Sequence, residues 1–518
     1  MESASGSSTI DPLQHAKICA DNAQLREERD ALKQQLDWFK RQLFGRKSEK
    51  RLIDNPDQLD LSALLGDVDR PSEPPPTEKI SYTRRKGKQR SKDCVTDSGL
   101  RFDERVPVES IELSAPQLHG PEADQYEIID HKITRKLAQR PGSYVVLEYR
   151  RPILKDKRLA TLLEVPAPSS VLENSLADVS FLAGLLVDKF AYHLPLYRQH
   201  QRLADAGITL SRSTLTRYVQ QAIGLLQPIH DAQWQHILQS KVLAMDETPI
   251  KAGRSGKGKM RQTWYWPIYG ENDEICFTWS TSRGSDHVIA QLGDFTGTLL
   301  TDGHKAYDVY ARKREAVTQA QCWVHLRRYF ERALASDLAA KEALDIIGEL
   351  YRIEREIRER QLTDQAKLDY RSRQARPIVD AFFAWCYTQR QRMDLVDSEP
   401  LSKALVYAEN HEDQLKVYLG DPAVPMDTNH LERALRVIPM GRKAWLFNWT
   451  EVGAQQVGVI QSLLTTCRLH DVNPYTYLVD VLQRIALHPD RDIEQLTPRC
   501  WKTLFANKPL VSDLDHAH

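Results

Sequence analysis

Three acidic residues have the types and the surroundings that metal-dependent phosphoryl chemistry requires. Asp246 follows the apolar run KVLAM, Asp302 follows a second such run, TGTLLT, and Glu432 lies in MDTNHLERALR, which predicts a helix after Pro425. If the two runs pair as parallel strands, the aspartates share a sheet edge, where their charges repel unless a divalent cation separates them. With Glu432 they would form a site for two Mg²⁺ or Mn²⁺ ions about 3.5–4 Å apart, which suits in-line displacement at a phosphodiester.

The elements that must position the aspartates lie in residues 238–335, which we interpret as the first part of an α/β catalytic core. The expected order is strand, strand, strand, helix, strand, helix, strand, with the helix at 285–292. The first three strands can form an antiparallel meander, and the fourth can pair parallel to the first. Strand alternation predicts that Glu247 faces away from Asp246, so we expect it not to be a ligand. A lone aspartate at a strand end is more often a cap or turn residue, so the argument depends on the pair.

The third acid is expected to return to the sheet from a distant helix. Residues 336–425 are strongly charged and predict a helical insertion, and residues 426–470 predict the second part of the catalytic core. Glu432 and Arg436 are four apart, so the alternative is an ordinary surface ion pair. Residues 471–518 predict a C-terminal helical tail.

Residues 1–50 predict a leucine-zipper-like helix. The seam comprises two series spaced by seven residues, with polar side chains at two positions: Ile18, Leu25, Leu32, Phe39 and Asn22, Arg29, Leu36, Leu43. This pattern is typical of a coiled coil and predicts a homodimer or larger assembly. The alternative is an amphipathic helix that packs on its own protein.

Residues 51–99 predict a disordered linker, acidic and proline-rich at first and then strongly basic. The basic run at 84–92, RRKGKQRSK, begins with Arg84, Arg85 and Lys86. Such a run is either a solvated tail or a nonspecific clamp on DNA phosphates.

Two further regions precede the predicted core. Residues 100–168 alternate loosely and predict a small β-rich module. Residues 169–237 predict helices, among them a helix at 195–206, a turn beginning at Gly207 and a second helix at 211–226. These are helix-turn-helix proportions, with Arg217 and Gln220 on the second helix as candidates for contact with DNA bases. Because helical hairpins are common, the shape alone does not establish DNA binding.

Basic and aromatic residues follow Glu432 closely. They suit DNA-backbone contact and stacking of an unpaired base, or else a solvated helix face with a core tryptophan; the set is Arg433, Arg436, Arg442, Lys443 and Trp445. His325 comes after Asp302 in the sequence, at the end of the next expected strand. It is a candidate accessory residue that contacts the scissile phosphate or packs the acids, and the alternative is a satisfied core histidine.

The composition limits the remaining classes. The 518 residues suggest two to four domains, 41% are hydrophobic and 27% are charged, and the 71 basic and 71 acidic residues cancel. The longest apolar run, around 181–187, is too short to span a bilayer, so we expect no membrane partner. We also expect no secretion signal, and scattered cysteines without a CxxC pair favour reduced thiols in a cytoplasm.

Motifs along nearly the whole chain resemble the large transposase of the insertion sequence 66 family. They occur in order as QLFGRKSEK at 42–50, MDETP at 245–249, TDGHKAY at 301–307, CWVHLRRYF at 322–330, NHLERALR at 429–436, GRKAWLF at 441–447 and NPYTYLVDVL at 473–482. The resemblance implies a multidomain α+β protein with a ribonuclease H-like catalytic domain. Its metal ligands would be Asp246, Asp302 and Glu432.

The same resemblance implies cutting and joining of double-stranded DNA at the inverted-repeat ends of an element and at a target. Accessory proteins of that element are possible partners, and the bacterial cytoplasm or nucleoid is the expected location. Members commonly carry a cysteine-rich zinc module where residues 100–168 lie. Only Cys94 is nearby, so four thiolates are impossible and we expect no zinc. The alternatives are an inactive, transposase-derived DNA-binding protein and a stand-alone metal-dependent nuclease.

Overall fold

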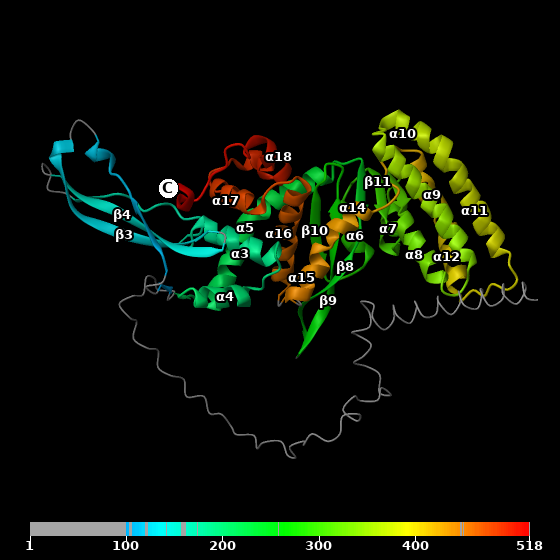
Figure 1. The fold of residues 1–518 in the computed structure, drawn as a ribbon, viewed down its shortest axis with the longest axis horizontal. Helices are drawn as coiled ribbons and strands as arrows, with labels where there is room; N and C mark the ends of the chain where they lie inside the picture. The colour runs from blue at the N-terminus through cyan, green and yellow to red at the C-terminus, as the bar shows by residue number, and fades with distance from the viewer. Residues whose placement is uncertain are drawn as a thin grey trace, which may run out of the picture. The chain divides into compact units, whose positions relative to one another are not determined.

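The computed structural model describes residues 100–516, apart from short stretches at 103–105, 120–122, 141, 157–161, 174, 257, 446–447 and 449 (Figure 1). The expected coiled coil at 1–50 and the linker at 51–99, with its basic run, lie outside the described residues, and both stay predictions. Within the described part of the chain, no helix is both long enough and apolar enough to cross a membrane.

The strands expected between 100 and 168 are present and centre on a long hairpin. β3 (Tyr126–Arg140) and β4 (Ser143–Asp156) pair antiparallel along nearly their whole lengths. Gly142 takes a φ of +86° in the turn between them, which glycine adopts without a Cβ clash. β2 (Val108–Glu112) runs parallel to β4, and β5 (Leu162–Glu164) pairs antiparallel with its far end.

The helices expected before the core are α3 (Val179–Phe190), α4 (Leu196–Asp205) and α5 (Arg212–Ile237). Ser211 caps α5 by accepting a hydrogen bond from the backbone N–H of Thr214. Between α4 and α5, β6 (Ile208–Thr209) pairs with β1 (Arg101–Phe102).

The helix expected at 211–226 continues to Ile237 through Pro228. A proline removes one backbone hydrogen bond, but the buried stripe beyond it, Ile229, Gln233 and Ile237, holds the helix to the neighbouring core.

A mixed sheet forms the centre of the described chain, in the order β10-β9-β7-β11-β12, with β8 paired to β9. Its strands are β7 (Val242–Met245), β8 (Thr248–Gly256), β9 (Lys259–Tyr269), β10 (Ile275–Ser280), β11 (Gly297–Thr301) and β12 (Val317–Gln321). β7, β9 and β10 pair antiparallel, whereas β11 runs parallel to both β7 and β12. β8 is an addition to the predicted order, because its polar sequence TPIKAGRSG gives little strand signal.

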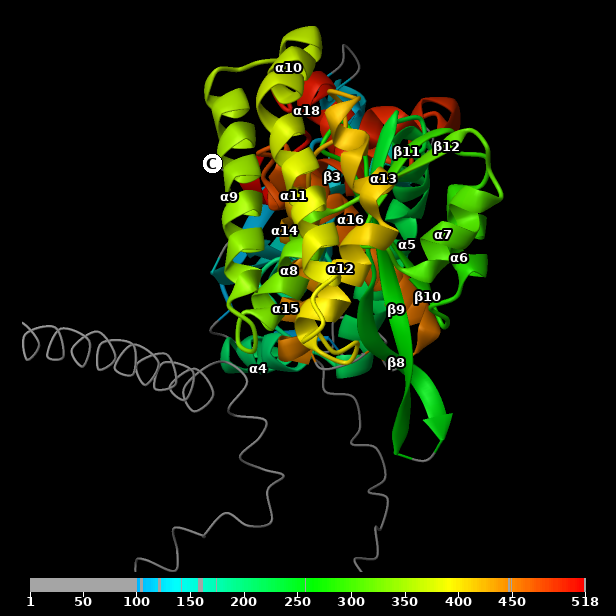
Figure 2. The ribbon, with the colours of Figure 1, turned by 90° about the vertical axis from the view of Figure 1, so that its right-hand side faces the viewer.

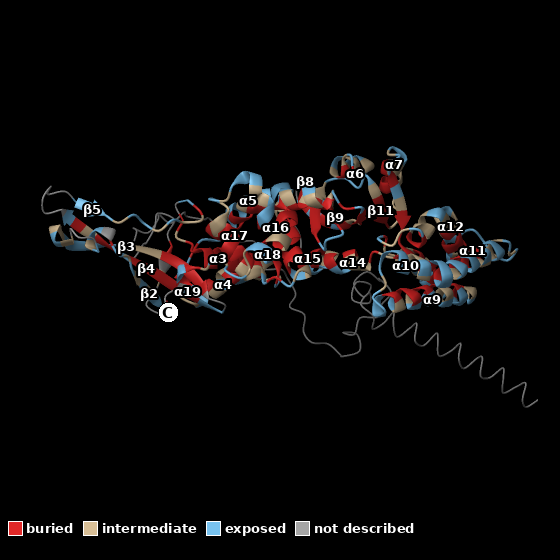
Figure 3. Cartoon of the chain, turned by 90° about the horizontal axis from the view of Figure 1, so that it is seen from above, coloured by how far each residue is buried: buried red, intermediate tan, exposed pale blue. Residues whose placement is uncertain are grey.

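Residues of this sheet enter three different cores. Leu243 and Met245 pack with α6 (Ser285–Leu292) and α7 (Lys305–Arg312) on one face. Ala244 belongs to the cluster on the other face, which includes α3, α5 and α16 (Glu451–Leu469). Figure 3 shows the buried residues concentrated in these layers.

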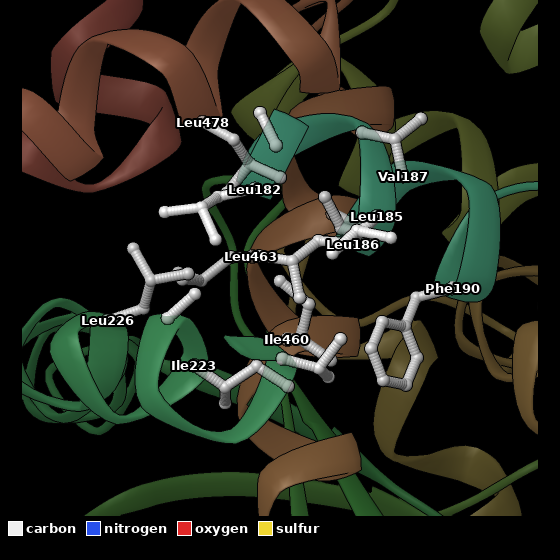
Figure 4. Packing of buried hydrophobic residues seen from close by; sticks show 14 of the residues in the cluster. Leu182, Leu185, Leu186, Val187, Phe190, Ile223, Leu226, Ile460, Leu463 and Leu478 are labelled. Atoms are coloured by element: carbon white, nitrogen blue, oxygen red, sulfur yellow. The ribbon is translucent and has the colours of Figure 1, made fainter. Parts of the chain in front are cut away.

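Three helices distant in sequence meet in the larger core. Figure 4 shows Leu182 and Leu186 of α3 against Ile223 of α5 and against Ile460 and Leu463 of α16. Because α3 is buried nearly all round, its apolar run serves as a core helix.

Residues 336–425 are helical, as the sequence predicts, and pack with the helix that precedes them in a core that also includes Val242, Leu300 and Ala320 of the sheet. The helices are α8 (Trp323–Ala333), α9 (Ala339–Glu359), α10 (Asp364–Tyr370), α11 (Arg376–Arg390), α12 (Pro400–Asn410) and α13 (Glu412–Lys416). In Figure 2, α9, α11 and α12 lie side by side.

The remaining helices are α14 (Asn429–Leu435), α15 (Val437–Trp445), α17 (Pro474–Arg484), α18 (Pro498–Leu504) and α19 (Asp513–His516). α17 packs on α3, and the Tyr149 hydroxyl in β4 donates to Asp513 of α19 at 2.7 Å. The last described residues therefore pack against the hairpin.

Candidate active site

Asp246 and Asp302 occupy equivalent positions just beyond two neighbouring parallel strands. The register pairs Leu300 with Ala244, and each aspartate follows two residues later. The parallel pairing that the sequence predicts is therefore confirmed. Carboxylate oxygens of Asp246, Glu247 and Asp302 lie within 4.8 Å of one another, which makes this a candidate cation site.

The electrostatics of this cluster favour a bound cation. The pKa of the Asp246 carboxyl is raised to about 8, chiefly by burial and then by the negative charges of Asp302, Glu247 and Glu432. One hydrogen bond opposes the rise, from the Glu247 backbone N–H to Asp246 Oδ1 at 2.7 Å. Opposite charge placed among these oxygens would favour the ionised form, and a divalent ion supplies such charge.

Glu247 lies inside the cluster, so the expectation that it faces away is wrong. β7 ends at Met245, and the strand alternation on which the expectation rested does not reach Glu247. Its side chain is 2% exposed and pairs with Arg283, and its Oε2 accepts a hydrogen bond from the Tyr307 hydroxyl at 2.9 Å. Both contacts restrain the glutamate beside the aspartates.

Glu432 lies on α14 and faces a different set of partners. Its Oε2 accepts a hydrogen bond from Arg328 at 2.5 Å, and its Oε1 is 3.8 Å from His325 Nε2. Oε1 is buried without a hydrogen-bond partner among the described residues. Glu432 is outside the group of oxygens within 4.8 Å, although its charge acts on Asp246. Glu432 therefore has an unpartnered buried oxygen and a charge that acts on Asp246.

His325, on α8, is near enough to Asp302 and Glu432 for their charges to act on its ring. Burial lowers the pKa of its ring most strongly; the positive charge of Arg328 lowers it further, and the charges of Asp302 and Glu432 oppose the shift. Its Nδ1 is buried and without a hydrogen-bond partner among the described residues. The ring is therefore near the candidate site, and one of its two nitrogens has no hydrogen-bond partner among the described residues.

The start of α8 is tied to the start of α14. Cys322 Sγ accepts hydrogen bonds from the Thr428 backbone N–H at 3.3 Å and from its hydroxyl at 3.2 Å. The Trp323 backbone N–H donates to the carbonyl oxygen of Met426 at 3.2 Å. These bonds fix the helix that carries Glu432 to the strand end beside Asp302.

The helical insertion also contacts the loop of the second aspartate. The Tyr407 hydroxyl on α12 donates to the backbone carbonyl of Asp302 at 2.7 Å and accepts a hydrogen bond from Gln321. The Tyr407 ring stacks on Tyr329 of α8, with centroids 4.4 Å apart. Gly303 has a φ of +83°, and a Cβ there would lie 2.5 Å from the Gln321 side chain, so the loop is closely fitted.

Family comparisons agree with this arrangement. The model described as "Transposase IS66 family" matches residues 174–456, more than half of the chain and all of the acids above. The chain belongs to the IS66 transposase family. Two further models also match: "IS66 C-terminal element" at 462–499 and "Transposase C of IS166 homeodomain" at 31–111.

Relatives of this IS66-family chain occur in Sinorhizobium fredii (strain NBRC 101917 / NGR234). The uncharacterized protein y4hP is 30% identical over 393 residues, which are 71% of this chain and 70% of the relative. The uncharacterized protein y4qI is 29% identical over 390 residues, 72% of this chain and 71% of the relative. Similarity therefore extends well beyond the acid motifs.

The candidate base-contacting residues of this IS66-family chain lie on an accessible helix face. Arg217 and Gln220 are exposed on α5, with Ser213 and Thr216 exposed beside them. The Gln220 backbone carbonyl accepts a hydrogen bond from Gln456 of α16, so this face is anchored to the core. Its role in DNA recognition stays a prediction.

The basic residues that follow Glu432 differ in their exposure and contacts. Arg433, Arg436 and Lys443 are exposed, whereas Arg442 donates to the carbonyl oxygen of Pro249 at 2.6 Å. Trp445 packs at the end of α3, with its ring centroid 5.8 Å from that of Phe190 and 5.5 Å from that of His193. The tryptophan therefore has protein neighbours, as the alternative for this cluster expects.

Sequence reasoning missed several residues that restrain the acids. Tyr307 and Arg328 stand inside the motifs TDGHKAY and CWVHLRRYF, so their motifs were the available signal. Arg283 and Tyr407 carried no such signal, because their contacts span 36 and 105 positions of sequence.

Proposed function

We propose that this IS66-family chain is a DDE transposase that cleaves DNA at the ends of an insertion sequence and joins them to target DNA. The observation that carries the proposal is the pair Asp246 and Asp302 at neighbouring parallel strand ends, together with an unpartnered oxygen of Glu432, whose charge acts on Asp246. These are the oxygen ligands that Mg²⁺ and Mn²⁺ prefer.

The proposal includes a ribonuclease H-like core made of residues 238–335 and 426–470, interrupted by the helical insertion at 336–425. The sheet order, with three antiparallel strands followed by two parallel ones, supports it. In this assignment the insertion is a positioning domain, because Tyr407 holds the loop of Asp302.

Each residue near the acids has a distinct task in this proposal. Two bound Mg²⁺ or Mn²⁺ ions would activate the attacking hydroxyl and stabilise the leaving oxygen. Asp246, Asp302 and Glu432 would hold them, and Arg328 would orient Glu432. The His325 ring would contact a phosphate oxygen of the scissile strand, because one of its nitrogens lacks a protein partner.

The proposed substrates are double-stranded inverted-repeat ends and target DNA. Residues 169–237 would contact bases through Arg217 and Gln220, while the run from Arg84 and the Arg436, Arg442 and Lys443 cluster would contact phosphates. We further propose a homodimer or larger assembly in the bacterial cytoplasm or nucleoid, with accessory proteins of the element as possible partners and no zinc requirement.

The test uses purified full-length protein, Mn²⁺ and labelled element-end DNA, with cleavage and joining scored separately. Asp246→Ala, Asp302→Ala and Glu432→Ala should each abolish cleavage and leave DNA binding nearly intact. Asp294→Ala is the matched control, since Asp294 is 92% exposed and pairs only with Arg314 among the described residues.

Two results would replace the proposal with another function. Cleavage without joining by the unchanged protein would identify a stand-alone nuclease. Specific DNA binding without either reaction would identify an inactive DNA-binding protein. Full cleavage by any one alanine variant would remove that residue from the metal site.

A further inference from the structure

The outer part of the hairpin formed by β8 and β9 is strongly basic. Residues 251–261, KAGRSGKGKMR, contain five lysines and arginines, and no acidic residue occurs from 248 to 270, although the charges of the whole chain cancel. Figure 1 and Figure 2 show this β8–β9 hairpin extending beyond the rest of its sheet. A projecting segment with charge of one sign attracts a partner of the opposite sign.

The charged side chains of the β8–β9 hairpin face solvent. Lys251, Arg254 and Lys259 are exposed, and neither lysine forms an ion pair within the part of the chain that the structure describes. Arg261 differs, because its guanidinium lies 3.1 Å from a carboxylate oxygen of Glu451 on α16. Arg261 therefore has a partner in its own chain, whereas the two lysines are available for an external one.

The base of the β8–β9 hairpin is fixed to the helices beside the sheet. The Gly253 backbone N–H donates to the Asn448 carbonyl at 3.1 Å, and the Asn448 N–H donates to the Lys251 carbonyl at 3.0 Å. Arg442 of α15 donates to the carbonyl of Pro249 at 2.6 Å. Beyond Gly253, β8 pairs with β9 alone among the described strands. The anchored base therefore sets the direction of a ribbon that has little stability of its own.

The β8–β9 hairpin also begins beside the acids of the candidate metal site. β8 starts at Thr248, two residues after Asp246. At about 3.4 Å per residue, Lys251 lies at most about 17 Å from Asp246 along the chain, and Arg254 at most about 27 Å. One turn of duplex DNA is about 34 Å long. A phosphate placed at the acids would therefore have the basic side chains within one turn of it.

We propose that the β8–β9 hairpin binds the backbone of the DNA duplex on which the acids act, within one helical turn of the scissile bond. Lys251, Arg254 and Lys259 contact phosphates, which carry one negative charge per about 1.7 Å of duplex. Such contacts position DNA without reading its sequence. A two-stranded ribbon also has the width that the major groove admits. This inference rests on the proposed function for the nature of the ligand and adds a DNA-contacting surface to it.

Neutralising the three side chains in the full-length protein tests the contact. Lys251→Gln/Arg254→Gln/Lys259→Gln is titrated with element-end and scrambled duplexes by fluorescence anisotropy, across a salt series and without divalent ions. We expect affinity for both duplexes to fall alike, by about tenfold or more at low salt. The slope of log affinity against log salt should decrease by about 2–3, because each phosphate contact contributes about 0.9.

The matched control removes the same charges elsewhere. Lys341→Gln/Arg355→Gln/Lys403→Gln changes three exposed residues of α9 and α12 and should bind as the unchanged protein does. Equal losses in the two triple variants, or a loss confined to the element-end duplex, would overturn the proposal. Unchanged binding by the hairpin variant would also overturn it and leave an acidic protein as the partner that fits the charge. Because binding is measured without cleavage, these outcomes are distinct from a failure of the proposed catalysis.

A chelated iron on the tip of the hairpin tests where the DNA lies. The label is attached to Ser255→Cys, an exposed position, after Cys19, Cys94 and Cys500 are replaced with serine. Radical scission should fall within about one turn of the element end or of the joining site, depending on which duplex carries the radioactive label; the first identifies element DNA and the second target DNA. Scission spread evenly along both duplexes, or no stronger than from a label on Lys341→Cys, would contradict the proposed position.

Discussion

At the scale of single residues, Glu247 of the acidic cluster and the separate Glu432 are both held by neighbouring basic or hydroxyl side chains. Glu247 is restrained by Arg283 and Tyr307, and Glu432 by Arg328. Carboxylates that repel each other need such restraints before a cation is present, since their mutual repulsion otherwise drives them apart. The restraining residues should therefore affect activity without being metal ligands.

Tyr407→Phe tests this expectation at the loop of Asp302. The change removes a hydroxyl that donates to a backbone carbonyl, a loss of about 1 kcal/mol, which corresponds to about a fivefold slower cleavage if the loop is displaced in the transition state. Tyr310→Phe is the control, because its hydroxyl donates to the carbonyl of Gly293 at 3.2 Å, away from the acids. Equal cleavage rates for the two variants would show that Tyr407 does not position the site.

Arg217→Ala tests recognition by α5. The side chain is exposed and suited to hydrogen bonds with base edges, so its loss should cost about 1–3 kcal/mol on element-end DNA and much less on a scrambled duplex. Neutralising Arg84, Arg85 and Lys86 should weaken binding to both duplexes alike and flatten the salt dependence. Fluorescence anisotropy across a salt series measures both effects. Equal losses for Arg217→Ala on the two duplexes would place sequence recognition elsewhere.

At the scale of elements, the insertion is hydrogen-bonded to the loop that precedes α14. Arg371 is fully buried and forms two hydrogen bonds with Glu354, at 2.8 and 2.9 Å. Its remaining nitrogen donates to the carbonyls of Tyr418, Asp421 and Val424. One guanidinium thus binds α9 to the loop that leads into the helix of the third acid.

Arg371→Met should destabilise the insertion strongly. It leaves Glu354 buried and uncompensated, which costs about 3–5 kcal/mol, and it leaves three carbonyls without their donor. Urea unfolding followed by tryptophan fluorescence measures the change, and Arg371→Met/Glu354→Leu should recover part of it. Arg352→Met removes an exposed ion pair and should leave the midpoint of the urea transition unchanged. An Arg371→Met variant as stable as the unchanged protein would contradict this role of Arg371.

The elements that the sequence predicts well are those with local signals. The apolar runs ending at Asp246 and Asp302, and the helix at 285–292, follow from periodicity and are present. β8 was not predicted because it is polar, and the position of Glu247 was not predicted because β7 ends two residues before it, so strand alternation does not apply there. The contact between Glu432 and Arg328 was also not predicted, because the two residues are 104 positions apart and no local pattern indicates such a contact.

At the scale of the whole molecule, one feature of the sequence predicts assembly. The heptad seam at 18–43 predicts a coiled coil. A net charge of zero leaves no overall repulsion between copies.

Charged residues in place of Leu32 and Leu36 should lower the mass measured by light scattering, because they disrupt the seam. A charged residue in place of Asn22, which is already a polar seam position, serves as the control and should have a smaller effect. An unchanged mass for the leucine variant would show that the helix packs within its own chain.

The burial of α3 between α5 and α16 has a consequence for the timing of synthesis. α3 and α5 leave the ribosome long before α16, which lies more than 200 residues later. At about 5–20 residues per second, the apolar surface of α3 remains uncovered for on the order of tens of seconds. During that interval the nascent chain offers this surface to chaperones, and the glutamate of α14 reaches the sheet only near the end of it. An emerging chain therefore acquires the third acid late, after the segments at 84–92 and 212–237 that are proposed to bind DNA.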